Sequence, residues 1–233
     1  MKLTVHYDDM HESPREWDNL GTMACEHSRY SLGDEGAELP EHDMLTDGEL
    51  LAAFRSEADD TLKAETLEYA ERWDCDLAEA VRDRFDDPRE YPYWIQAALR
   101  EKAVILPLYL YDHSGITMST GSFGCPWDSG QVGIIWVSHE KIREEYGEVT
   151  AETIEKAERC LRGEVEVYDL YLRGNCFGFL VEDDDGEHVD SCGGFLVEWG
   201  DKTYGGMAEH MDDNVAAMLD QAFDNIGEAV EIE

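Results

Sequence analysis

The chain has 233 residues, with 55 acidic and 18 basic side chains and a formal net charge of −37. Hydrophobic residues make up 42% and aromatic residues 10% of the sequence, which excludes a disordered acidic tail and predicts a folded protein with its own core. That core must form against strong self-repulsion of like charges, so the acidity requires an explanation.

The sequence predicts a cytoplasmic protein. The start, "MKLTVHYDDMHESP", lacks the apolar stretch and small-residue cleavage site of a signal peptide. The sequence contains no run of about 18 apolar residues, so it predicts no membrane span. The six cysteines occur singly, without a CxxC pair, which is typical of free thiols rather than of a zinc ribbon or a redox dithiol.

The first half of the chain predicts two short strands followed by helices. Residues 2–7 alternate as a strand does, and residues 22–28 form a second candidate strand. Thr46 or Asp47 is a good N-cap for a long helical pattern, which Pro88 ends. Leu62, Tyr69 and Trp73 fall on one side of that helix, together with Ala80 and Arg84. Another short helix begins after Pro92.

The middle of the chain predicts a buried hairpin with a long loop. Residues 103–112 form the most apolar run and read as a strand in which Pro107 indicates an edge, a bulge or a bend. Residues 131–138 form a second buried strand. The glycine-rich segment between them predicts a structured loop that Trp127 pins, and such loops often carry function.

The last third predicts alternating helices and strands. Residues 139–147 predict a helix closed by Gly147. Residues 150–163 predict a helix with Thr150 as N-cap and Gly163 just beyond its end. The remaining predicted elements are strands at 164–172, 176–182 and 188–199, a hairpin turn at 173–175, a bulge at Gly193–Gly194, and an amphipathic helix at 207–226 followed by a tail.

These elements predict an α+β fold, a mostly antiparallel sheet packed with acidic amphipathic helices. Without a linker or a repeat, residues 1–233 are expected to form one domain. Within it we expect a helical subregion at 46–101, a sheet core at 103–199 and the C-terminal helix at 207–226.

Residues 112–128 contain side chains that can carry enzyme chemistry. Asp112, His113 and Ser114 are adjacent, but neighbouring side chains on a strand point to opposite faces, and no GxSxG elbow is present. We interpret this stretch as a strand end at which Asp112 and Ser114 cap a turn. Cys125 is a candidate nucleophile only if His113 or His188 lies beside it. We therefore predict no catalytic residue.

Metal and cofactor signals are equally weak. His113, Cys125, Cys176, His188 and Cys192 lack the spacing of a metal site. Residues 183–190, "DDDGEHVD", lack the register of a calcium loop and read as an acidic turn. No P-loop, GxGxxG or HExxH motif occurs, and no basic patch favours direct contact with nucleic acid. We predict neither a metal nor a cofactor.

Several long stretches of the sequence resemble a family of uncharacterised phage and plasmid proteins. These stretches are "ESPREWDNLGTM" (12–23), "LYLYDHSGITMST" (108–120), "CPWDSGQVG" (125–133), "EKIREEYG" (140–147), "GEVEVYDLYLRG" (163–174) and "EDDDGEHVDSCGGF" (182–195). The resemblance brings no activity and no catalytic residue. It implies a small protein that a mobile element makes inside a bacterial cell.

The acidic residues are concentrated outside the buried strands, since residues 102–139 contain only Asp112 and Asp128. Duplex DNA carries about one charge per 1.7 Å of axis. Carboxylates along one helix face recur about every 5–6 Å, comparable to the phosphates along one strand. Such a surface can occupy a groove lined by Lys and Arg, and its binding weakens with salt.

Charge and resemblance together predict an anti-defence protein that acts as a DNA mimic. Its expected partner is a positively charged host nucleic-acid-binding protein or a nuclease complex of the restriction or CRISPR type, bound without chemistry in the host cytoplasm. The expected contacts are Asp76, Glu79, Asp83 and Asp86 on the long helix, Asp183, Asp184 and Asp185 on a turn, and Asp212, Asp213 and Asp220 near the C-terminus.

The sequence leaves two other functions and the oligomeric state open. The chain fits a hydrolase or a regulatory protein with its site in residues 107–133. It also fits a halophilic protein whose acidic coat serves solvation alone. The sequence does not decide whether the protein forms a homodimer.

Overall fold

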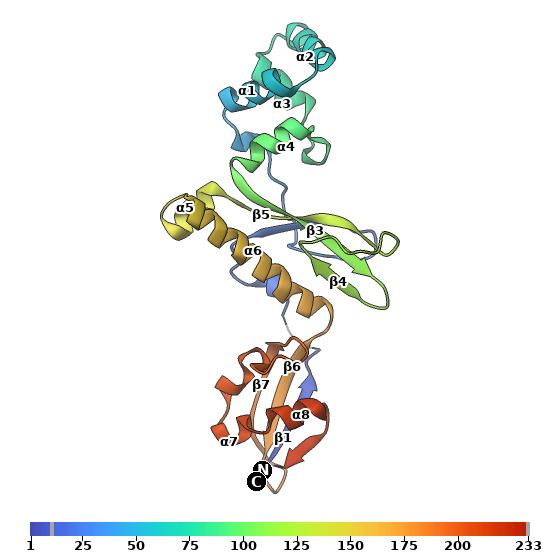
Figure 1. Cartoon of the computed structure of the whole chain (residues 1–233), viewed down its shortest axis with the longest axis vertical. Coiled ribbons are helices and arrows are strands. Elements are labelled where there is room, and N and C mark those ends of the chain that lie inside the picture. The colour runs from blue at the N-terminus through green and yellow to red at the C-terminus, as the bar shows by residue number, and fades with distance from the viewer. Residues whose placement is uncertain (10–11, 232–233) are drawn as a thin grey trace. The chain divides into compact units, whose positions relative to one another are not determined.

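The computed structural model describes residues 1–9 and 12–231 and has the predicted α+β architecture (Figure 1). Within these residues the strands form two four-stranded sheets, with the orders β7-β6-β1-β8 and β2-β5-β3-β4. The last two residues of the predicted tail, 232–233, lie outside the described part.

The elements have the following bounds. The helices are α1 (Asp47–Glu57), α2 (Asp60–Trp73), α3 (Leu77–Arg84), α4 (Tyr93–Arg100), α5 (His139–Tyr146), α6 (Ala151–Leu172), α7 (Asp213–Ala216) and α8 (Leu219–Asp224). The strands are β1 (Lys2–Tyr7), β2 (Thr22–Cys25), β3 (Ala103–Asp112), β4 (Ile116–Ser119), β5 (Ser129–Ser138), β6 (Cys176–Glu182), β7 (His188–Leu196) and β8 (Ala229–Glu231). Short 3₁₀ helices are η1 (Pro14–Glu16), η2 (His42–Met44), η3 (Pro88–Glu90) and η4 (Tyr204–His210).

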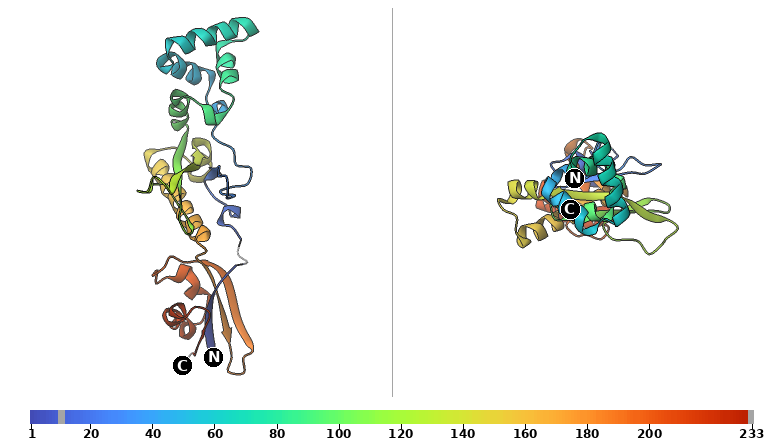
Figure 2. Two further views of the ribbon diagram at one scale, coloured as in Figure 1. Left: turned by 90° about the vertical axis from the view of Figure 1, so that its right-hand side faces the viewer. Right: turned by 90° about the horizontal axis from the view of Figure 1, so that it is seen from above.

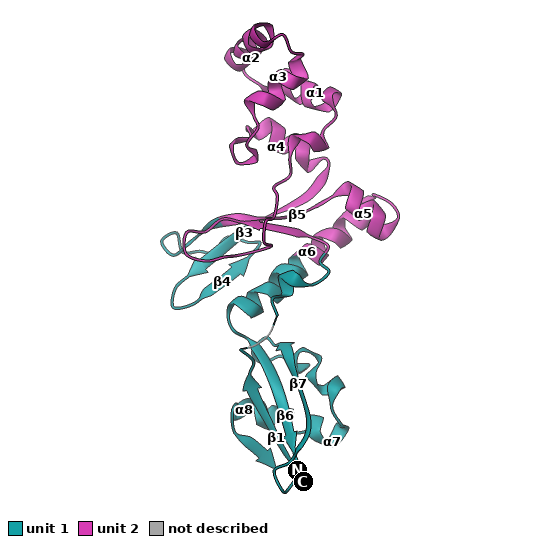
Figure 3. Cartoon of the chain, turned by 180° about the vertical axis from the view of Figure 1, so that it is seen from behind, with its two compact units in different colours: residues 1–19, 108–131, 162–233 teal, residues 20–107, 132–161 magenta. Residues whose placement is uncertain are grey.

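The chain divides into two compact units (Figure 3). Unit 1 consists of residues 1–19, 108–131 and 162–233, and unit 2 of residues 20–107 and 132–161. Each unit therefore joins segments that are far apart in the sequence. The expectation of one domain over 1–233 stays a prediction.

The sheet β7-β6-β1-β8 lies in unit 1, and its strand β1 alternates between buried and more exposed residues. In β1, Leu3 and Val5 are fully buried, whereas the residues between them face away. β1 pairs antiparallel with β6, from Lys2 opposite Glu182 to Tyr7 opposite Phe177. The helices α7 and α8 lie on one face of this sheet (Figure 2). They complete an apolar core to which the strands contribute Leu3, Val5, Phe177, Phe179, Val181, Phe195 and Val230, and the helices Val215, Leu219 and Ala222.

Unit 2 contains a helical core. Thr46 opens α1 with a capping box: its hydroxyl accepts a hydrogen bond from the Glu49 N–H, and the Glu49 carboxylate accepts one from the Thr46 N–H. Helices α1 and α4 pack through Leu50, Phe54, Trp94 and Ile95, all of them buried. The N-cap at Thr46 and the helix after Pro92 are confirmed.

The prediction of one long helix over 47–87 is wrong, because three aspartates interrupt it. Asp59 accepts a hydrogen bond from the Leu62 N–H and starts α2. Asp74 adopts a left-handed conformation, with φ 54°, and ends α2. Asp76 accepts from the Glu79 N–H and starts α3, which ends at Arg84, before Pro88. Short acidic side chains compete for backbone N–H groups, and here they act as caps.

The prediction of a strand over 164–172 is also wrong, because α6 continues through Gly163 to Leu172. The alternation of polar and apolar residues in "EVEV" (164–167) is typical of a strand. The buried positions follow helical spacing instead: Ala157, Leu161, Val165 and Tyr168. Residues 173–175 therefore close a helix rather than a hairpin, with the Asn175 N–H bonded to the Leu170 carbonyl.

The loop between β3 and β5 contains the strand β4, which the sequence did not predict. β4 pairs with β3 from Tyr109 opposite Ser119 to Asp112 opposite Ile116. The intervening turn holds Ser114 at φ 61°. At the C-terminus, the predicted single helix over 207–226 is wrong: η4, α7 and α8 replace it, and β8 adds a strand beside β1.

Candidate partner-binding surface

The four carboxylates predicted on the long helix lie around α3 of unit 2, and all four are exposed. Asp76 caps the helix, Glu79 and Asp83 belong to it, and Asp86 follows its end. We call these four residues the α3 stripe. The structure therefore confirms their exposure but not the long helix that was expected to carry them.

The two arginines of α3 do not neutralise the α3 stripe. Arg82 bonds Asp47 at 2.9 Å, and Arg84 bonds Glu65 at 2.9 Å. None of the four stripe carboxylates forms an ion pair within residues 1–9 and 12–231. The stripe consequently presents uncompensated negative charge to solvent.

The stripe affects two neighbouring groups. Burial raises the pKa of the Cys75 thiol, and the carboxylates of Glu79, Asp83 and Asp76 raise it further. Burial also raises the pKa of Tyr69, as does nearby Asp83. Both groups therefore stay protonated and uncharged at neutral pH, so neither changes the net charge of the stripe.

Exposed apolar side chains accompany the stripe. Trp73 is 65% exposed and Leu67 is 51% exposed, both on α2. The rings of Tyr69 and Trp73 lie 6.2 Å apart. Sequence periodicity placed Trp73 on the same side as Leu62, which packs against the helical core, so the exposure of Trp73 was not predicted. Tryptophan is enriched among the residues that contribute most of the binding energy in protein interfaces, so exposed Trp73 is a candidate contact for a protein partner.

The aspartates of the β6–β7 turn in unit 1 differ in role. Asp183 is half-buried, and its Oδ1 accepts hydrogen bonds of 2.9 Å from the N–H groups of Asp185 and Glu187. Asp184 is exposed and pairs with the terminal amine of Met1, which lowers its pKa. Asp185 is exposed. Thus Asp183 shapes the turn, whereas Asp184 and Asp185 face solvent.

The remaining predicted contacts, Asp212, Asp213 and Asp220, are also exposed in unit 1. Asp212 precedes α7 without a side-chain capping bond. Asp220 accepts a hydrogen bond of 2.5 Å from the ammonium of Lys202. The ten predicted residues are therefore divided, with four in unit 2 and six in unit 1.

Charge is distributed unequally between the units. Unit 1 holds 26 acidic and 5 basic residues, and unit 2 holds 29 acidic and 13 basic residues. Most bases of unit 1 are already engaged: Arg15 bonds Glu164, Arg162 bonds Thr120, Arg173 bonds Asp169 and Glu198, and Lys202 bonds Asp220. Unit 1 is therefore the more strongly negative unit.

Residues 107–133 contain a small polar cluster around Asp128. Its carboxylate lies 3.4 Å from Nδ1 of His113 and 3.6 Å from Sγ of Cys125. Its carbonyl accepts a hydrogen bond of 2.8 Å from the Asp112 N–H. A cysteine–histidine pair requires the imidazole beside the sulfur, but among the described residues His113 contacts Asp128 and forms no hydrogen bond with Cys125. Asp128 thus organises the loop.

Two predictions for this loop have definite outcomes. Ser114 belongs to the β3–β4 turn, as the turn interpretation requires. Trp127 does not pin the loop, because its side chain is 92% exposed. Its neighbours Pro126 and Asp128 do not predict whether Trp127 is buried, because its exposure depends on the three-dimensional course of the loop.

The candidate metal ligands are not gathered into a site. Among residues 1–9 and 12–231, no group of three or more His, Cys, Asp or Glu side chains is placed to hold a metal ion. Cys176 is buried, and this burial raises its pKa from 9.0 to about 11. Cys192 is exposed on β7, where Nε2 of His188 lies 3.0 Å from Oγ of Ser191.

Comparison with known proteins adds no relative. No protein-family model matches the chain, and no curated protein and no solved structure matches it significantly. Among the described residues, no helix combines the length and the apolar character needed to cross a membrane.

Proposed function

We propose that the chain is an anti-defence protein of a phage or another mobile element, and that its acidic surface imitates nucleic acid. It binds a positively charged host nucleic-acid-binding protein, such as a restriction or CRISPR nuclease complex, where DNA would otherwise bind. Inhibition is stoichiometric and needs no catalysis.

The α3 stripe carries this proposal. Carboxylates that have local basic partners contribute little to binding a cationic surface, because binding must first break those pairs. The stripe has no such pairs, since Arg82 and Arg84 turn to Asp47 and Glu65. Its four charges are thus available to a partner rich in Lys and Arg, and many weak contacts share the binding energy.

The test replaces the charges of the α3 stripe and keeps the N-cap hydrogen bond of α3. Asp76 is a helix cap, so Asp76→Asn keeps the capping hydrogen bond, whereas Glu79, Asp83 and Asp86 are each changed to Lys. The variant is expressed in bacteria that carry a restriction or CRISPR system, and plating of a targeted phage is measured. We expect protection of the phage to fall at least tenfold.

A matched control keeps the same change in net charge. Glu140, Glu144 and Glu145 are changed to Lys and Glu148 to Gln, all four being exposed at or after α5. This control should protect the phage as well as the native protein does. Full protection by both variants would contradict a role for the stripe, and equal loss in both would reduce the effect to net charge alone.

The runner-up is a hydrolase or a regulatory protein with its site in residues 107–133. The contact of Asp128 with both His113 and Cys125 favours it. Substitution of Asp112, His113, Cys125 and Asp128 by Ala distinguishes the two functions. Loss of activity with an unchanged circular-dichroism spectrum and unfolding curve would favour a site in this loop, whereas retained activity favours the acidic surface.

A further inference from the structure

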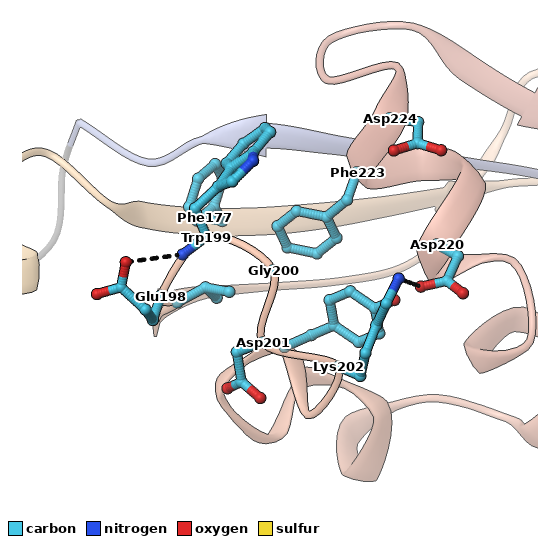
Figure 4. A pocket seen from close by; sticks show the side chains of 11 residues that line it. Phe177, Glu198, Trp199, Gly200, Asp201, Lys202, Asp220, Phe223 and Asp224 are labelled. Atoms are coloured by element: carbon cyan, nitrogen blue, oxygen red, sulfur yellow. Dashed lines mark hydrogen bonds and ion pairs between the residues drawn. The ribbon is translucent and has the colours of Figure 1, made fainter.

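Unit 1 contains a pocket of about 90 Å³ walled by aromatic side chains (Figure 4). Phe177 comes from β6, Trp199 and Tyr204 from the segment after β7, and Phe223 from α8. The space holds several water molecules or the end group of one long side chain. It is too small for a nucleotide.

The aromatic wall is closely packed on one side and open on the other. Phe223 stacks on Tyr204 with ring centres 4.9 Å apart and meets Phe177 edge to face at 5.2 Å. Trp199, in contrast, is 69% exposed although it lines the pocket. An aromatic ring held at the mouth of a pocket is available to stack on a ligand.

The backbone holds Tyr204 in an unusual position. Its φ is 52°, in the left-handed region that tyrosine rarely adopts. Gly205 follows with φ 63°, and a Cβ at that position would lie 2.6 Å from the Leu196 carbonyl oxygen. The Tyr204 hydroxyl is buried and has no hydrogen-bond partner among the described residues. A buried polar atom that lacks a partner requires an explanation, and a polar group or water molecule held in the pocket beside it is one.

The rim of the pocket is acidic. Hydrogen bonds from the side chain and the N–H of Thr203 lower the pKa of Asp201, which therefore stays ionised. Asp224 is exposed and makes no ion pair with any described residue. Carboxylates at this position favour a cation and disfavour an anionic ligand.

The chain's own lysine already shows how a cation sits there. The Lys202 ammonium bonds Asp220 at 2.5 Å (Figure 4). It also lies 5.9 Å from the centre of the Tyr204 ring. Aromatic faces attract cations at such distances. A guanidinium matches this environment better than an ammonium because it is planar, weakly hydrated, stacks on rings and donates to carboxylates through several N–H groups.

We propose that this pocket binds an arginine side chain of the protein partner, with the guanidinium stacked on the aromatic wall and bonded to the acidic rim. The basic nature of that partner rests on the proposed function, whereas the preference for a cation follows from the pocket alone. Lys202 lies at the rim and competes with the incoming arginine for Asp220.

The test titrates the full chain with N-acetyl-arginine methylamide and follows amide signals by NMR. N-acetyl-citrulline methylamide is the control probe, since it has nearly the same shape without the charge. We expect saturable binding of the arginine probe, with citrulline at least tenfold weaker and the lysine analogue several-fold weaker. Citrulline binding as strong as arginine, or no saturation, would overturn the site, and equal binding of lysine would overturn the preference for arginine.

Variants locate the binding. Trp199→Ala and Asp224→Asn, both at exposed positions, should weaken the arginine probe several-fold, and Lys202→Met should strengthen it. Asp212→Asn, an exposed change of the same type outside the pocket, should leave it unchanged. Unchanged affinity in Trp199→Ala would contradict the assignment. Because these titrations use no host protein, they distinguish failure of the pocket from failure of the anti-defence function.

Discussion

The ammonium nitrogen of Lys102 donates a hydrogen bond of 2.6 Å to Oε1 of Glu49. Glu49 also completes the capping box with Thr46 at the start of α1, and Lys102 directly precedes β3. One carboxylate therefore joins the start of the helical core of unit 2 to the start of a strand. These contacts lower the pKa of Glu49 from 4.5 to about 2.

This lowered pKa predicts a pH-dependent effect of Glu49→Gln. The folded pKa lies below the unfolded one, so the ionised carboxylate stabilises the fold above about pH 4.5, and its contribution is lost as the pH falls toward 2. Glu49→Gln should lower the urea midpoint at pH 7 and differ progressively less from native protein on acidification. Glu145→Gln, at an exposed site on α5, is the control, and a difference that stays constant with pH would contradict the linkage.

The two tryptophans Trp94 and Trp127 should differ sharply in their contribution to stability. Trp94 is 2% exposed and meets Phe54 and Phe85 edge to face at 5.6 and 5.7 Å. Trp94→Ala should lower the free energy of unfolding by about 3–5 kcal/mol, with Trp94→Phe as the milder variant if that protein does not fold. Trp127→Ala should change it by less than about 0.5 kcal/mol in urea unfolding. A loss above about 2 kcal/mol in Trp127→Ala would show that the loop needs this side chain for folding.

The cysteines should react with thiol reagents in an order set by burial. Cys176 is 1% exposed, and its raised pKa of about 11 leaves almost no thiolate at pH 8. Cys192 is exposed on β7. Iodoacetamide should modify Cys192 more than tenfold faster than Cys176 in peptide mass spectra, and Cys192→Ser should remove the fast product. Equal rates under native conditions would mean that the β6 strand opens readily.

Salt should stabilise the fold mainly at low concentration. Like charges in unit 1, with 26 acidic and 5 basic residues, repel one another, and screening is largely complete by about 0.3 M salt. The thermal midpoint should therefore rise steeply up to that concentration and change little beyond it. Strong further stabilisation that appears only in molar KCl would support the halophilic explanation instead.

Local sequence signals correctly predict the start of α1 and the end of α5. The capping residues at Thr46 place α1, and Gly147, with φ 85°, ends α5 as expected. Aspartates were ambiguous because the same residue serves as helix surface or as cap, which is why Asp59 and Asp76 were read as part of one helix. The strand error at 164–172 arose from treating Gly163 as a stop, although a helix tolerates glycine at a cost of about 1 kcal/mol.

The candidate sites were predictable only in part. The exposure of Glu79 and Asp83 follows from their spacing on a helix. The pairing of Arg82 with Asp47 and of Arg84 with Glu65 does not, since it depends on how the helices pack. The pocket proposed to bind arginine is lined by residues from β6, the segment after β7 and α8, and no local sequence pattern connects these segments.

The most direct test of the anti-defence function is a competition measurement on the captured host target. The chain is immobilised, lysate from bacteria carrying a restriction or CRISPR system is applied, and short duplex DNA and salt are titrated against the bound protein. We predict that duplex DNA displaces the target, that the logarithm of the binding constant falls linearly with the logarithm of salt concentration, and that the α3 stripe variant retains less target at every salt concentration. A target that stays bound in saturating duplex DNA and at high salt would contradict mimicry of nucleic acid.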